Sequence, residues 1–384
     1  MKVLHVIPSM AAVHGGPSRA IVLMETALRE RGIDVETATT DDDGPGQRNG
    51  RACGRPLREG DATRWYFRKA MEFYKPSPAF ARWAAREVGR FDVVHIHGLF
   101  SFTSTAAARA ARRAGVPYVV RPLGALNLYG TTRRRPWLKR LSIAWIEAPL
   151  LARAAAVHFT SEQEAAQARR LGIAMNEAVI PLAVEGLQER AAQPHRPARD
   201  SGGLRLLFLS RLDPKKNVEQ LLEAVARLRA QQPGIGLQVA GDGSPAYVAT
   251  LKARAESLGL AGTVTWSGHV EGAAKAAAFA DADLFVLPSL SENFGIAAAE
   301  ALAAGVPCLL GEDVAIAQEV AQAGAGAVTA PDAASIAGAI TRLAADPAAR
   351  TAMSARAQAL ARERYSMAAM GERLAQLYAS IARR

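Results

Sequence analysis

The chain has 384 residues, 49% hydrophobic and 22% charged, a composition that excludes a disordered protein. Because single hydrophobic cores stop growing near roughly 250 to 300 residues, we expect two domains. The formal net charge of +11 lies in the first 200 residues, which carry 30 lysines and arginines against 19 acidic residues. Such a field attracts nucleic acid, anionic lipid or a phosphorylated acceptor, and charge alone does not distinguish them.

The sequence also indicates the compartment and the membrane topology to expect. No run approaches the roughly 20 apolar residues of a membrane helix. The start, MKVLHVIPSM, enters a strand pattern without a small-residue cleavage site, so we expect a cytoplasmic chain. The two cysteines, Cys53 and Cys308, are too few for a disulfide framework and fit a reducing compartment.

Short apolar runs alternate with helical patterns along both halves of the chain. The runs in the first half are 3–9, 35–40, 92–98, 117–122 and 156–161, and those in the second half are 204–210, 237–241, 264–268, 283–289 and 306–311. This alternation is typical of a parallel, doubly wound sheet. We therefore predict an α/β fold with two Rossmann-like domains facing a central cleft, residues 1–187 and 204–361. The polar segment 188–203 is the predicted linker.

The segment 291–307, SENFGIAAAEALAAGVP, follows one of these strands and carries the densest signal for ligand binding. A helix that begins near Gly295 would point free N–H groups and its positive dipole end at a diphosphate. Glu300 stands among Ala, Ile and Leu, and a buried carboxylate needs partners such as ribose hydroxyls. Glu292, in the preceding loop, could accept bonds from a sugar. Alternatively, Glu292 only favours the helix dipole and Glu300 faces water.

A second signal is SRLDPKKN (210–217), directly after another strand. Arg211 and Lys216 can converge there on one anion, and two cations would neutralise a leaving diphosphate. A solvated basic turn is the plainer alternative.

These motifs together resemble family 4 of the retaining glycosyltransferases, enzymes of the two-domain GT-B architecture, over essentially the whole chain. The family's E-x7-E pattern matches Glu292 and Glu300, and its phosphate-binding Arg and Lys match Arg211 and Lys216. AGDG (240–243) and SGHV (267–270) stand at the expected strand ends. The resemblance implies retention of configuration and a final helix, about 362–384, that packs back on the first domain.

The resemblance also implies roles for individual donor-side residues. Glu300 should bind the ribose and Glu292 the donor sugar, with Val270 at the edge of the base. The remaining donor-binding positions that it implies are Gly15, Gly16, Gly241, Asn293, Phe294, Gly295 and Ile296.

In the first half, Gly15 and Gly16 precede a helical pattern, which is a weak signal that departs from G-x-G-x-x-G. His95 and His97 lie two apart on one strand and so point to the same side. By resemblance, His97 lies beside the transferred sugar, while His95 is expected in the core. A zinc pair would lack Cys or Glu partners for the remaining ligands, so no metal site is predicted.

The acceptor side is expected at VRPLGALN (120–127), where Arg121 and Gly124 line the cleft by resemblance. The family often has Pro-Arg-Gly or Pro-His-Gly at this place, and the departure leaves the acceptor open. Arg121 is alternatively a surface or ion-paired residue.

Two aromatic and basic segments suggest contact with a membrane. Seven of the 23 aromatic residues fall between Trp65 and Trp83, and 133–147 places Trp137, Leu141 and Trp145 at helical spacing, with five basic residues clustered at the start of the segment. We hypothesise that one of these segments holds the chain at the anionic inner leaflet. The alternative is a helix buried against its own domain.

The predicted mechanism is positioning and stabilisation of the leaving phosphate by Arg211, Lys216 and the helix start at Gly295. With His97 and Glu292, these cations form the predicted catalytic set. Asp281 and Asp283 are expected in a strand-entry loop and 41–43 in an acidic surface loop, so neither metal nor cofactor is predicted.

The predicted function is transfer of a hexose from a GDP- or UDP-sugar to a glycan or lipid-linked oligosaccharide in bacterial surface polysaccharide synthesis. A sugar-nucleotide epimerase or phosphorylase on the same fold is the alternative enzyme. A basic nucleic-acid-binding protein would fit the pI, although no motif for it is found and nucleic acid is not an expected partner. A silent glycan-binding subunit is disfavoured by the phosphate-binding residues.

Overall fold

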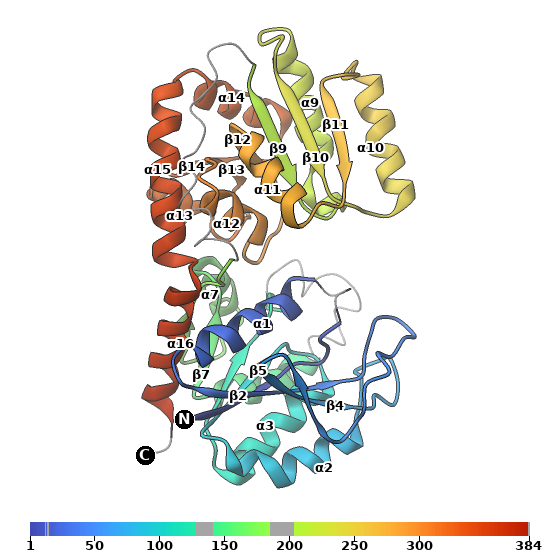
Figure 1. Cartoon of the computed structure of the whole chain (residues 1–384), viewed down its shortest axis with the longest axis vertical. Coiled ribbons are helices and arrows are strands. Elements are labelled where there is room, and N and C mark those ends of the chain that lie inside the picture. The colour runs from blue at the N-terminus through green and yellow to red at the C-terminus, as the bar shows by residue number, and fades with distance from the viewer. Residues whose placement is uncertain (12, 14, 127–140, 185–202, 383–384) are drawn as a thin grey trace. The chain divides into compact units, whose positions relative to one another are not determined.

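The computed structural model describes residues 1–11, 13, 15–126, 141–184 and 203–382 (Figure 1). They form two compact units. Unit 1 comprises Met1–Ala183 and Met367–Arg384, and unit 2 comprises Val184–Ser366. The predicted linker, 188–203, lies almost entirely outside the described residues.

Unit 1 contains a sheet of strand order β3-β4-β2-β1-β5-β6-β7-β8, parallel except for the β3–β4 pair. Its elements are β1 (Lys2–Val6), α1 (Gly16–Arg29), β2 (Asp34–Thr40), β3 (Pro56–Glu59), β4 (Ala62–Phe67), α2 (Pro78–Glu87), η2 (Val88–Arg90), β5 (Val93–His97), α3 (Phe102–Ala114), β6 (Tyr118–Arg121), η3 (Ile143–Glu147), α6 (Ala148–Ala152), β7 (Ala156–Phe159), α7 (Glu162–Arg169), β8 (Glu177–Val179) and α16 (Met367–Ile381). Strand order reverses between β1 and β5, the place where ligands bind in open α/β sheets.

Unit 2 contains an all-parallel sheet of order β11-β10-β9-β12-β13-β14. Its elements are β9 (Arg205–Leu209), η4 (Pro214–Lys216), α9 (Val218–Arg229), β10 (Gly236–Ala240), α10 (Pro245–Ser257), β11 (Val264–Gly268), α11 (Gly272–Asp281), β12 (Leu284–Leu287), α12 (Ile296–Ala303), β13 (Cys308–Gly311), α13 (Ala317–Gln322), β14 (Gly326–Thr329), α14 (Ala333–Ala344) and α15 (Pro347–Arg364). This is the Rossmann order, with its reversal between β9 and β12. The prediction of two Rossmann-like domains is confirmed.

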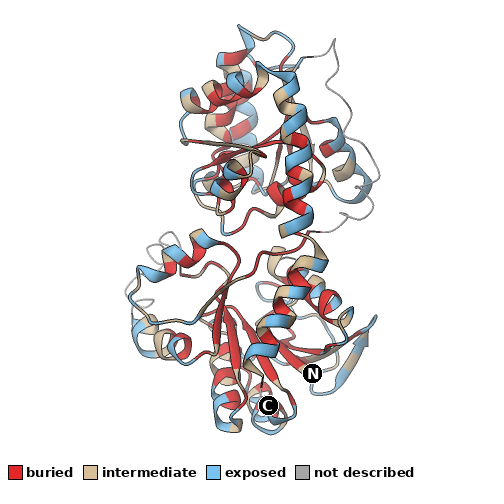
Figure 2. Cartoon of the chain, turned by 90° about the vertical axis from the view of Figure 1, so that its left-hand side faces the viewer, coloured by how far each residue is buried: buried red, intermediate tan, exposed pale blue. Residues whose placement is uncertain are grey.

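The central strands are buried because helices cover both faces of each sheet, and Figure 2 shows them in red beneath helices with exposed outer faces. The edge strands β3, β8, β11 and β14 are only partly buried. In unit 1, side chains alternate along β1 and β5. Leu4 and Ile96 join the apolar core with α2 and α3, whereas His5 and His95 face the other side. The sheet of unit 1 thus has one apolar face and one polar patch.

The aromatic segment from Trp65 to Trp83 is mostly core. The rings of Trp65, Phe67, Phe80 and Trp83 pack with centroids 5.1–6.1 Å apart, on β4 and α2. β4 was not among the predicted strands, and neither were β3, β8 and β14. Only the loop between β4 and α2 still fits the predicted contact with a membrane, because Phe73 in this loop is 70% exposed.

The acidic loop at 41–43 was expected on the surface, which is correct only for Asp43. Asp41 and Asp42 are buried, and Asp42 pairs with Lys69 at 2.6 Å and with Lys75. Two adjacent lysines make this burial possible, since an unpaired buried carboxylate would be very costly.

The C-terminal helical pattern consists of two helices, since α15 ends at Arg364 in unit 2 and α16 begins at Met367 in unit 1. Among the described helices, none combines the length and apolar character that crossing a bilayer requires.

Candidate functional site

The carboxyl ends of β9 and β12 are neighbours in the unit 2 sheet, and the segments after them carry the predicted phosphate-binding residues. Arg211 follows β9 and is exposed, and Lys216 ends the short helix η4 and is buried. Leu290, after β12, donates its N–H to the Lys215 carbonyl at 2.8 Å. This bond joins the two loops at the point where strand order reverses.

Lys216 and Glu292 form a tight ion pair between these loops. The Lys216 side chain is 6% exposed, and burial lowers its pKa while the carboxylate of Glu292 opposes that shift. Glu292 is fixed by its backbone, which bonds to Asp313 and Ala315 at 3.0 Å each. The sequence predicted both residues for the site, but not their direct contact.

Helix α12 begins beside this ion pair. Its N-cap is Gly295 at φ +91°, and a Cβ there would lie 3.2 Å from Val314 Cγ1, so the position favours glycine. Phe294 is buried and packs edge-on against Tyr365 at 5.5 Å, whereas Asn293 is exposed and Ile296 half-buried. The first N–H groups of a helix have no intrahelical partner, so this end can bind an anion.

Glu300 is buried at 7% exposure, which excludes the interpretation that it faces water. It pairs with Lys275 of α11 at 2.7 Å. Lys275 was missed by the sequence analysis because it belongs to an unremarkable Ala-rich helix, and only the fold brings it to Glu300.

Two further predicted donor-side residues lie along neighbouring strand ends. Gly241 follows β10 at φ +137°, where a Cβ would overlap the Ser210 carbonyl, and its N–H bonds to the Gly268 carbonyl at 2.6 Å. Val270 is half-buried between β11 and α11. Gly241 is therefore needed for strand packing whatever its role toward a ligand.

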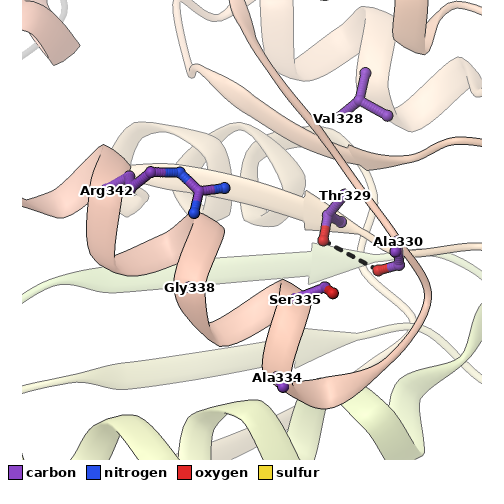
Figure 3. A pocket seen from close by; sticks show the side chains of 7 residues that line it. All are labelled: Val328, Thr329, Ala330, Ala334, Ser335, Gly338 and Arg342. Atoms are coloured by element: carbon purple, nitrogen blue, oxygen red, sulfur yellow. Dashed lines mark hydrogen bonds between the residues drawn. The ribbon is translucent and has the colours of Figure 1, made fainter.

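A hollow of about 380 Å³ lies beside edge strand β14 (Figure 3). It is lined by Val328, Thr329, Ala330, Ala334, Ser335, Gly338 and Arg342. None of the predicted site residues lines it.

In unit 1, Gly15 is the exposed N-cap of α1 at φ +65°, and Gly16 is the first residue of the helix. Gly124 donates its N–H to Glu164 Oε1 at 2.9 Å. Arg121 is buried at 2% exposure, which excludes a surface position, and burial lowers its pKa to about 10. At neutral pH the guanidinium is therefore still charged.

His97 is fully buried, and neither ring nitrogen has a hydrogen-bond partner among the described residues. Its ring stacks obliquely on His95 at 4.1 Å and lies 4.9 Å from His5. Burial lowers the pKa of all three histidines, to about 3 for His5. The rings are thus neutral at pH 7.

His5 was missed by the sequence analysis, although it interrupts the apolar run of the first strand. One nitrogen from each of His5, His95 and His97 lies within 4.8 Å of the others. In the sequence, His95 and His97 had no evident partner for a metal site. The fold brings a third nitrogen, from His5, close to them.

Two family models cover most of the chain. A glycosyl transferase 4-like domain matches residues 15–183, and the glycosyl transferases group 1 model matches residues 189–360. Together they span both units.

The curated relatives are glycosyltransferases of several kinds. Glycogen synthase of Mycobacterium tuberculosis H37Rv is 31% identical over 225 residues, 55% of this chain and 54% of that protein. The chain thus spans about half the length of that relative. GDP-mannose:cellobiosyl-diphosphopolyprenol alpha-mannosyltransferase of Komagataeibacter xylinus is 26% identical over 337 residues, 86% of this chain and 81% of that protein.

Solved structures share the fold. Sucrose-phosphate synthase of Thermosynechococcus elongatus has a TM-score of 0.77 at 20% identity, covering 99% of this chain and 98% of that one. Anabaena HepE, solved with UDP and glucose, has a TM-score of 0.73 at 19% identity, covering 99% and 100%. Both domain models match, the fold agrees over the full length, and the E-x7-E pair lies at the switch point: the chain belongs to the family 4 glycosyltransferases of the GT-B type.

Proposed function

We propose that this protein is a retaining, metal-independent transferase that moves a hexose from a GDP- or UDP-sugar to a glycan or lipid-linked oligosaccharide in bacterial surface polysaccharide synthesis. The observation that carries the proposal is the cluster of Lys216, Glu292 and the α12 start at the switch point of unit 2. A GDP-mannose-dependent relative over 86% of the chain supports the choice of donor and of a lipid-linked acceptor.

In the proposed mechanism, the donor diphosphate replaces Glu292 as the partner of Lys216. The ammonium, Arg211 and the N–H groups after Gly295 then stabilise the negative charge that grows on the leaving phosphate. Glu292, released from Lys216, accepts hydrogen bonds from the sugar. The pairing in the free protein lowers the cost of a buried ammonium until the donor arrives.

Glu300 is proposed to bind the ribose hydroxyls, with Lys275 holding its carboxylate in place at 2.7 Å. Val270 is proposed at the base edge, and Gly241, Asn293, Phe294 and Ile296 complete the donor side. A buried carboxylate that is already oriented accepts hydrogen bonds from two vicinal hydroxyls without reorganisation.

Unit 1 is proposed to bind the acceptor, with Arg121 and Gly124 on that side and His97 near the transferred sugar, while Gly15 and Gly16 are proposed to contact the donor. The His97 proposal needs a close test, because its ring is buried. Arg121, equally buried, would act through its charge and its neighbours rather than by direct contact.

Transfer is tested by incubating the protein with UDP- and GDP-hexoses and polyprenyl-diphosphate oligosaccharides, with and without EDTA. The expected result is release of one nucleoside diphosphate together with an α-linked product from an α-linked donor, unchanged by EDTA. Inversion at the anomeric carbon or dependence on a divalent ion would contradict the corresponding part of the proposal. An epimerised sugar nucleotide with no free diphosphate would favour the epimerase alternative.

We also propose peripheral contact with the anionic inner leaflet. Trp145 of η3 is 79% exposed, Leu141 51% and Phe73 70%, all in unit 1, while the basic cluster at 133–140 lies outside the described residues. Co-sedimentation with phosphatidylglycerol vesicles should fall severalfold in the double variant Phe73→Ala/Trp145→Ala, with Val22→Ala as an exposed apolar control. Equal binding to phosphatidylcholine vesicles would contradict the electrostatic part.

A further inference from the structure

Four buried histidines and one tyrosine form a polar cluster on one face of the unit 1 sheet. His5 lies on β1, His95 and His97 on β5, and His158 on β7, all with no exposed surface. Tyr378 of α16 reaches them and is also fully buried. Because the pKa of each imidazole is lowered by burial, each ring is neutral and carries one N–H and one acceptor nitrogen.

The hydrogen bonds among them can run in one direction only. The Ile180 carbonyl accepts, so His158 Nε2, at 2.8 Å from it, must carry the hydrogen. His158 Nδ1 is then an acceptor, and His95 Nε2 donates to it at 3.3 Å.

The same logic continues to the other end. His95 Nδ1 has no hydrogen, so it accepts the hydroxyl hydrogen of Tyr378 at 2.7 Å. The Tyr378 oxygen, having given its one hydrogen, accepts from His5 Nε2 at 3.3 Å. His5 Nδ1 is therefore left as a bare acceptor in the interior.

The chain ends in a group of buried polar atoms without partners. Within the described residues, His5 Nδ1, both nitrogens of His97 and Arg121 Nε lack any hydrogen bond. Arg121 is the register partner of His97 on the neighbouring strand, so it lies beside this end of the cluster. Buried polar groups nearly always have partners, and so many orphans together indicate an internal ligand.

The chemistry of the cluster favours a neutral ligand over a cation. Arg121 places a positive charge beside the histidines, and both nitrogens of His95 are already engaged. Zinc bonds of about 2.0–2.1 Å would draw the nitrogens to roughly 3.4 Å of one another. A water molecule with two bonds of about 2.8 Å can instead span separations up to the observed limit of 4.8 Å.

We propose that a buried water molecule donates to His5 Nδ1, contacts a ring nitrogen of His97 and accepts from Arg121 Nε, making Tyr378, His5 and His95 positioning residues for His97. The water then completes a chain of fixed polarity from the Ile180 carbonyl to the end of β5. Tyr378 makes α16 part of the arrangement that orients the His97 ring. The effect on catalysis rests on the proposed function, whereas the water and the proton order do not.

The proton order is tested in the unmodified protein by long-range ¹H–¹⁵N spectra of a sample labelled at histidine. Signals are assigned with single His→Gln variants. The expected result at pH 7 is a neutral Nε2–H tautomer for His158, His95 and His5. A Nδ1–H tautomer or an imidazolium at any of the three would overturn the proposed order.

The water is tested by a high-resolution crystal structure and by metal analysis of the purified protein. Density for a water bonded to His5 Nδ1 supports the proposal. One equivalent of metal that is lost in His5→Gln, or a cluster with no ordered water, overturns it.

The positioning role is tested with Tyr378→Phe, which removes the hydroxyl and keeps the ring. We expect the His5 and His97 signals to shift and kcat to fall about tenfold, with nucleotide affinity unchanged because the residues proposed to bind the base, the ribose and the leaving phosphate lie in unit 2. The matched control is Tyr118→Phe, which removes a buried hydroxyl bonded to the Leu150 carbonyl in the same unit. Unchanged histidine signals in Tyr378→Phe would overturn the positioning role. If the unmodified protein binds no nucleotide, that result would count only against the proposed function.

Discussion

The two switch points of this molecule use opposite electrostatic designs. In unit 2, charged side chains meet in pairs: Lys216 with Glu292 in the loops after β9 and β12, and Lys275 of α11 with Glu300 of α12. In unit 1, the switch point holds buried, neutral imidazoles, with Tyr378 of α16 and the charge of Arg121 beside them. Paired ions can exchange a partner for a ligand, whereas the buried neutral rings donate and accept hydrogen bonds in a fixed order.

The largest effect is expected at the ion pair of unit 2. Lys216→Ala should reduce the rate of transfer about 100-fold or more, roughly 3 kcal/mol, because the ammonium that stabilises the leaving phosphate is lost and Glu292 is left without its partner Lys216. Steady-state kinetics with the preferred donor measures this. Lys215→Ala removes a neighbouring charge and serves as the control, and an equal loss there would mean that general basicity, not pairing, matters.

The next effect is expected at low pH, which should destabilise unit 1 more than unit 2. The folded-state pKa of His5 and His158 is lowered to about 3, so between pH 6.5 and 3 the unfolded chain binds more protons and stability falls as pH falls. From pH 7 to 5.5, these two residues should cost unit 1 about 2 kcal/mol. Hydrogen exchange of β1, β5 and β7, compared with β9 and β12, measures it. Equal acid loss in both sheets would contradict a special role of the cluster.

An effect of opposite sign is expected at Glu147. Burial raises its pKa to about 7, so the folded state binds more protons between pH 4.5 and 7 and stability falls as pH rises. Glu147→Gln keeps an acceptor for the Phe100 N–H at 3.1 Å. It should therefore stabilise unit 1 by up to about 3 kcal/mol at pH 8 and leave it nearly unchanged at pH 4.

Denaturant unfolding followed by tryptophan fluorescence measures this change, because four of the five tryptophans precede residue 183. Equal stabilisation at both pH values would show that charge is not the cause.

The sequence predicted the proximity of the proposed donor-side residues better than that of the unit 1 residues, for a physical reason. Arg211, Lys216 and Glu292 stand in the loops that follow β9 and β12, and Glu300 stands in the helix after the second loop, so local pattern and strand order together place them. Lys275 lies on a separate helix, and only tertiary packing brings it to Glu300.

The histidine cluster has a similar limit. His5, His97 and Tyr378 come from the start, the middle and the end of the chain, and local periodicity carries no sign that they meet. The spacing of His95 and His97 on one strand was a signal, and His5, a polar residue within an apolar strand, offered a second one. The burial of Asp42 was missed because its partners, Lys69 and Lys75, follow in a loop more than 25 residues later.

The central claim is that unit 2 binds a nucleoside diphosphate through these paired charges, and calorimetric titration with UDP, GDP, ADP and NAD tests it most directly. We predict that UDP or GDP binds, that NAD does not, and that Glu300→Ala and Lys216→Ala each weaken binding at least tenfold. The Lys215→Ala control should bind normally. Absence of binding by all four nucleotides, or binding that neither variant weakens, would contradict the account.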